Sequence, residues 1–103
     1  MEEAHLLKIS DELGHGFDQV SAVARLLAED ATIPFIARYR KEVTRSLDEV
    51  QITNIRDRMQ QLEELDNRKA AILKSLEQHG HLTDELKEQV LAAETLAILE
   101  DIY

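Results

Sequence analysis

Residues 46–80 read SLDEVQITNIRDRMQQLEELDNRKAAILKSLEQHG, with no Gly or Pro before Gly80. Apolar side chains recur along this run at the spacing of one face of an α-helix: Val50, Ile55, Met59, Leu62, Leu65, Ile72, Leu73 and Leu76. An unbroken helix here would be on the order of 48 Å long, whereas a compact domain of this size has a radius of gyration of about 13 Å. We therefore expect one long central helix that either outreaches its own domain or breaks near Asp66–Asn67.

Residues typical of helix ends divide the rest of the chain. Ser46 and Glu49 have the spacing of a capping box, which predicts that the long helix starts at Ser46. Gly14 and Gly16 are expected to end a first helix, and Asp18 is expected to cap a second one.

Three threonines predict the starts of further helices at Thr32, Thr83 and Thr95, and Pro34 suits the first turn that follows Thr32. Three Gly and one Pro are too few for a turn-rich β-sandwich or barrel. The predicted fold class is therefore all-α: a single helical domain over residues 1–103, with five to six helices and one long central helix.

Composition limits the location and chemistry of the chain. It has no Cys and a net charge of −9. The lack of Cys excludes disulfides and thiolate chemistry and fits a cytoplasmic protein. The acidic start argues against a secretory signal, and no apolar run is long enough to span a bilayer. Any nucleic-acid contact needs a local basic patch, because the chain as a whole repels a polyanion.

Neither a metal site nor a catalytic site is predicted, and no cofactor is expected. His79 and His81 flank Gly80, but they lack the fixed spacing of a metal-binding pair, so we interpret them as a polar turn. Adjacent carboxylates such as Glu63 and Glu64 point about 100° apart on a helix and do not share a site. The sequence contains no Gly-rich phosphate loop and no nucleophile elbow.

Residues 33–45, IPFIARYRKEVTR, hold four of the twelve basic residues within eight positions: Arg38, Arg40, Lys41 and Arg45. On a single helix, one side would gather the apolar residues Phe35, Ile36, Tyr39 and Val43, and another side would gather Arg38, Lys41 and Arg45. The functional interpretation is a patch that contacts phosphates or an acidic partner. The alternative is pairing with acids of neighbouring helices, which needs no function, and composition alone favours this alternative.

The second half of the long helix is another candidate contact surface. The other helices are expected to be short and to cover the part from Leu47 to Met59. This leaves four residues for packing against a partner helix or domain: Leu65, Ile72, Leu73 and Leu76. The chain is therefore expected to bury this stripe in a longer parent protein, or to self-associate at high concentration.

Several motifs resemble those of the Tex family of bacterial transcription accessory proteins. The run Ile33–Glu42 looks like the signature segment of that family, and Val43–Gln51 resembles the stretch that follows it. Arg68–Ser75 and Leu99–Tyr103 are also similar, so the resemblance spans nearly the whole chain. The family usually has Gly where this chain has Arg45, which adds a positive charge and weakens the case for a special backbone turn there.

The resemblance implies the N-terminal segment of a long, multidomain, cytoplasmic protein that binds nucleic acid and acts in transcription. Later domains, including an OB-fold RNA-binding module, would lie outside these residues. The implied local role is a helical scaffold that packs against those domains, with Arg38–Arg45 as an auxiliary contact to RNA or DNA and the transcription machinery as a further partner. The alternative is a self-associating helical interaction module without nucleic-acid contact.

We predict that the chain has no hydrolytic activity, because no nucleophile, base and orienting group can be assembled from its residues. Incubation of the purified chain with RNA, DNA and nucleotides should leave all three intact. Cleavage that disappears when one carboxylate is changed would contradict this prediction.

Overall fold

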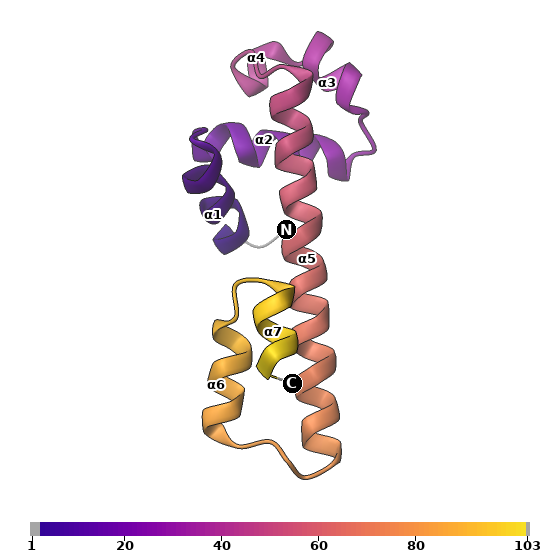
Figure 1. The fold of residues 1–103 in the computed structure, drawn as a ribbon. Coiled ribbons are helices and arrows are strands. Elements are labelled where there is room, and N and C mark those ends of the chain that lie inside the picture. The colour runs from indigo at the N-terminus through magenta and orange to yellow at the C-terminus, as the bar shows by residue number, and fades with distance from the viewer. Residues whose placement is uncertain (1–2, 103) are drawn as a thin grey trace. The chain divides into compact units, whose positions relative to one another are not determined.

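A computed structural model describes residues 3–102, which form seven α-helices and no strand (Figure 1). They are α1 (Glu3–Leu13), α2 (Phe17–Ala28), α3 (Ile33–Tyr39), α4 (Lys41–Thr44), α5 (Glu49–Gln78), α6 (Asp84–Ala92) and α7 (Leu96–Ile102). The all-α fold with one long central helix is thereby confirmed. The described part has seven helices because the expected third helix is divided at Arg40, whose backbone leaves the helical region (φ −125°, ψ 32°).

The chain divides into two compact units, one ending at Gln60 and the other beginning at Gln61. This boundary falls inside α5, so the helix supplies its first part to one unit and its second part to the other. The helix continues through Asp66 and Asn67, which excludes the alternative of a break there.

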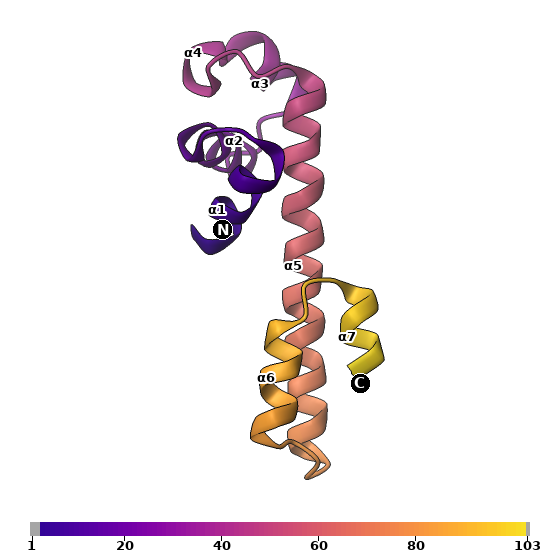
Figure 2. The same cartoon turned by 60° about the vertical axis from the view of Figure 1, so that its left-hand side comes forward.

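In the first unit, α1 to α4 lie on one side of the first part of α5, and α2 runs across α5 (Figures 1 and 2). The core of this unit is aliphatic. Its fully buried apolar side chains are Ile9, Val20, Val23, Ile36, Ile52 and Ile55. Val50 is 68% exposed, because the buried face of α5 runs through Ile52 and Ile55 and not through Val50.

In the second unit, α6 and α7 lie beside the second part of α5 (Figure 2). The buried cluster consists of Leu65, Ile72, Val90, Ala93 and Leu99, and the half-buried Leu73, Leu76 and Ile102 pack against it. Contrary to the expectation of a stripe left for a partner, Leu65 and Ile72 are only 5% and 1% exposed, because α6 and α7 cover them. Contact of Leu73 and Leu76 with a further partner stays a prediction.

One ion pair in each unit connects α5 to another helix. Arg58 Nε lies 2.9 Å from Glu12 Oε2 on α1, and Arg68 Nε lies 2.7 Å from Glu100 Oε1 on α7. The hydrogen bond from Arg68 lowers the pKa of the Glu100 carboxyl below its usual value. Exposed pairs of this kind contribute less than about 1 kcal/mol, so these pairs orient helices that the aliphatic cores stabilise.

The three threonine starts are confirmed. The hydroxyls of Thr32, Thr83 and Thr95 each accept a hydrogen bond from the amide three residues later, at 3.3, 3.1 and 3.2 Å. Each bond satisfies an amide that has no partner inside the helix. Gly14 follows the last residue of α1 with a φ of +72°, as expected for a glycine that ends a helix.

The expected capping box at Ser46 is wrong. Asp48 is the cap of α5: its carboxylate accepts from the Gln51 amide at 2.8 Å, and the Gln51 side chain accepts from the Asp48 amide at 3.0 Å. Ser46 cannot serve because its φ is +67°, whereas an N-cap residue has an extended backbone.

The start of α2 is also two residues earlier than expected. Gly16 is the N-cap, and the Gln19 side chain accepts from the Gly16 amide at 2.9 Å. Asp18 therefore lies in the first turn, where its negative charge suits the helix dipole.

We predict that Ile72→Ala lowers the free energy of unfolding by about 2–5 kcal/mol, because it leaves a cavity in the second core. Ile98 on α7 is 49% exposed, so Ile98→Ala is a matched control that should change stability by about 0.5 kcal/mol or less. Urea denaturation followed by circular dichroism measures both. Equal losses would show that Ile72 is not buried as described.

Candidate nucleic-acid interface

The backbone of residues 33–45 separates the basic residues that one helix would have gathered. Arg38 belongs to α3, Arg40 lies between the two helices, and Lys41 starts α4. Arg45 follows α4 in the left-handed region, with φ 54° and ψ 49°. The four cations therefore do not share one helix face, and Arg45 does occupy a special backbone turn despite the absence of Gly.

The apolar residues of α3 also divide into two groups. Ile36 is fully buried, whereas Phe35 is 40% exposed and Tyr39 is 59% exposed. The expected common apolar side of Phe35, Ile36 and Tyr39 is therefore wrong: only Ile36 turns into the core. Val43 is half-buried on α4, because the break at Arg40 changes the helix direction.

Two aromatic rings and two arginines form what we call the aromatic–arginine cluster: Phe35, Arg38, Tyr39 and Arg40. The ring centroids of Phe35 and Tyr39 are 5.4 Å apart with an interplanar angle of 45°. Arg38 Cζ lies 5.6 Å from the Tyr39 centroid, and Arg40 Cζ lies 5.7 Å from the Phe35 centroid. These distances are within the range of cation–π attraction.

The four predicted cations differ in how they are neutralised. Arg45 Nη2 lies 2.7 Å from Asp18 Oδ1, and Arg40 Nη1 lies 3.7 Å from Glu42 Oε1. Within residues 3–102, no carboxylate forms an ion pair with Arg38 or Lys41. The geometry thus leaves two positive charges for an external anion, while the other two follow the alternative of pairing inside the chain.

Gln19 was missed by the sequence analysis, although it holds the turn at Arg45. Its side-chain NH2 group donates to the carbonyl oxygen of the fully buried Thr44 at 2.9 Å. Its side-chain oxygen accepts from the backbone amide of Gly16. A Cβ added at Gly16 would lie 2.6 Å from Arg45 Nη2. Gly16 therefore leaves the space in which Arg45 reaches Asp18. The available signal was a Gln three residues after a glycine at a helix start.

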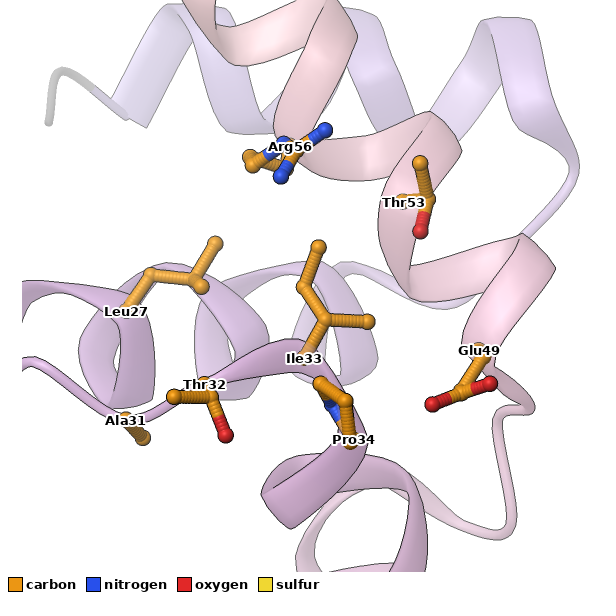
Figure 3. Close-up of a pocket in the computed structure, with 8 residues that line it drawn as sticks. All are labelled: Leu27, Ala31, Thr32, Ile33, Pro34, Glu49, Thr53 and Arg56. Atoms are coloured by element: carbon orange, nitrogen blue, oxygen red, sulfur yellow. The ribbon is translucent and has the colours of Figure 1, made fainter.

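A depression of about 550 Å³ lies between α2, α3 and α5 (Figure 3). Its lining residues are Leu27, Ala31, Thr32, Ile33, Pro34, Glu49, Thr53 and Arg56. Arg56 Nη2 is 2.9 Å from its neighbour Asp57, so its charge is partly neutralised. The mixed lining shows no convergent set of polar groups that would define a ligand.

The histidines predicted to form a polar turn lie after α5. His79 Nδ1 is 2.7 Å from the Ser75 carbonyl oxygen, which places this ring against its own helix end. Among residues 3–102, no group of three or more His, Cys, Asp or Glu side chains could hold a metal ion. In the same described range, no helix is long and apolar enough to cross a membrane.

The described residues thus form an all-helical domain that carries an exposed aromatic and cationic surface. The profile of the Tex-like protein N-terminal domain matches residues 3–77, and the chain belongs to this family. The resemblance found in the sequence is thereby confirmed.

The relatives that the chain matches are much longer than the chain itself. It is 47% identical over 95 residues to the Transcriptional accessory protein Tex of Neisseria gonorrhoeae, covering 92% of this chain and 12% of that protein. It is 44% identical over 103 residues to Protein YhgF of Escherichia coli, covering all of this chain and 13% of that protein. The S1 RNA-binding domain-containing protein 1 of Homo sapiens is a more distant match, 28% identical over 80 residues, or 78% of this chain and 8% of that protein.

We predict that Arg45→Gly is more stable than Arg45→Ala by about 1 kcal/mol, because only glycine adopts the left-handed region without steric conflict. Both variants lose the pair with Asp18, so the comparison isolates the backbone. Thermal and urea denaturation provide the measurement. If the alanine variant is as stable as the glycine variant, Arg45 does not have this backbone conformation in solution.

Proposed function

We propose that this chain is the N-terminal helical scaffold segment of a cytoplasmic transcription accessory protein that binds RNA. The observation that carries the proposal is the 47% identity to a protein named for transcription. The RNA part is supported by the name of the human relative and by the unpaired cations Arg38 and Lys41. Both side chains are positively charged hydrogen-bond donors that can bind phosphate oxygens.

The scaffold role concerns domains outside this chain. The chain spans only 12–13% of the two bacterial relatives, so most of such a protein lies beyond these residues. Several apolar side chains of the second unit are exposed: Leu91, Leu96 and Ile98. Exposed apolar groups of this kind favour burial against another surface, and we assign that surface to later domains of the parent, with the half-buried Leu73 and Leu76 as additional contacts.

The nucleic-acid contact would be local and auxiliary. With a net charge of −9, the chain as a whole repels RNA. Arg38 and Lys41 are close in sequence and form no ion pair within residues 3–102, so we assign the contact to them. Binding by this chain alone should therefore be weak and independent of base sequence, while binding by the parent benefits from its other domains. The transcription machinery is a further proposed partner, supported by the same relative.

We further propose that the chain contributes no catalytic group and needs no cofactor. The support is chemical: the sequence lacks Cys, and several of its carboxylates serve helix caps or ion pairs, as Asp48 and Glu100 do.

The second candidate function is a self-associating helical interaction module without nucleic-acid contact. The exposed Leu91, Leu96 and Ile98 favour it, because two copies could bury these side chains against each other. Light scattering across concentrations, with and without RNA, separates the two candidate functions. A dimer that does not bind RNA supports this second function.

We predict that Arg38→Ala combined with Lys41→Ala weakens RNA binding by the full-length protein that carries this chain. Each lost phosphate contact should reduce the slope of log affinity against log salt by about 0.7 for single strands. The control combines Lys74→Ala with Lys87→Ala, which removes the same charge from exposed positions of the second unit. An unchanged affinity and slope for the first pair would refute the contact.

A further inference from the structure

We propose that the aromatic–arginine cluster is a stacking site for the bases of single-stranded RNA. The inference rests on the proposed function and deepens it, because it names the form of the nucleic acid and adds base contacts to the phosphate contacts of Arg38 and Lys41.

The exposure of Phe35 and Tyr39 is the first observation. The chain has only four aromatic residues, and two of them, Phe35 and Tyr39, lie one helical turn apart on α3 and are 40% and 59% exposed. Aromatic side chains contribute most to stability when buried, and the neighbouring Ile36 shows that α3 has a buried face. Two rings kept outside the core on one short helix are available for a flat ligand.

The arrangement of the four side chains is the second observation. The 45° angle between the rings prevents either ring from fully covering the face of the other. Arg38 and Arg40 lie near the ring faces at 5.6 and 5.7 Å, and a guanidinium plane can itself stack on a base. A base inserted beside Tyr39 would therefore meet an aromatic face and a planar cation together.

Charge directs the backbone of the strand to one part of this surface. Arg40 lies close to Glu42, and Glu29 and Asp30 line the depression next to Phe35. Phosphates are repelled from these carboxylates and attracted to Arg38 and Lys41, which have no acidic partner in the described range. Bases on the rings and a phosphate on Arg38, which lies over the Tyr39 ring, make a consistent arrangement for one strand. Lys41, the first residue of α4, offers a second phosphate contact further along the chain.

A single strand fits this site and a duplex does not, because stacking on an aromatic side chain needs a base whose face is free. Cations with exposed aromatic rings are the combination used by proteins that bind single strands without sequence preference. A protein partner is the rival occupant, and it would leave RNA affinity independent of the rings.

In the test, the 103-residue chain is added to a fluorescein-labelled uridine dodecamer, and the fluorescence anisotropy of the dodecamer is measured at several salt concentrations. Phe35→Leu combined with Tyr39→Leu should weaken binding about tenfold with an unchanged salt slope, since no phosphate contact is lost. Tyr39→Phe keeps the ring and should bind like the unchanged chain. Circular dichroism confirms that the variants remain folded.

Two comparisons make the outcome decisive. A dodecamer of the same charge with abasic sugars should bind about as weakly as the leucine variant binds the normal strand. Equal binding of the abasic and normal strands, or unchanged binding by the leucine variant, would overturn the stacking site and leave the proposed phosphate contact standing.

The same ring variants are placed in the full-length protein, where weak binding by the chain alone does not limit the measurement. There, a loss for the leucine pair supports the stacking site, and an unchanged affinity overturns it. Failure of the proposed function is separate: it requires that replacing Arg38 and Lys41 also leaves RNA binding unchanged.

Discussion

The backbone hydrogen bonding of α5 continues from Glu49 to Gln78 without interruption, and the buried side chains of both units depend on it. Ile52 and Ile55 enter one core, while Leu65 and Ile72 enter the other. A proline in the middle would remove a hydrogen bond and distort the helix at a cost of about 3 kcal/mol or more. Because the period of the helix sets which side chains face each core, any change in its register would affect both units.

The candidate interface depends on a different constraint, the backbone between α3 and α5. The break at Arg40 and the left-handed turn at Arg45 distribute cations that are close in sequence over separate positions. Gln19 and the buried Thr44 hold this turn against α2, and Asp18 neutralises Arg45. Of the four cations in residues 33–45, Arg38 and Lys41 are consequently the two without an ion pair in the described range, and Arg38 lies over the exposed Tyr39.

The sequence predicted the features that depend on local chemistry: the all-α class, the long helix and the threonine caps. It failed where several residues could serve equally well, since Asp48 competes with Ser46 as the cap of α5. It also failed where distant segments decide the result. The spacing of Leu65 and Ile72 identifies an apolar face, but only the return of α6 and α7 shows what covers it. The orientation of Tyr39 likewise depended on where α3 ends, which no periodicity reveals.

A helix shared by two cores has a kinetic consequence. Starting a helix is unfavourable by a factor of about a thousand, whereas extending it adds one hydrogen bond for each residue fixed. Whichever core first orders its part of α5 supplies a nucleus from which the helix can grow through Gln60 and Gln61 into the other part. The second core then assembles on a preformed turn, so the order of folding of the two units is coupled through the main chain of α5.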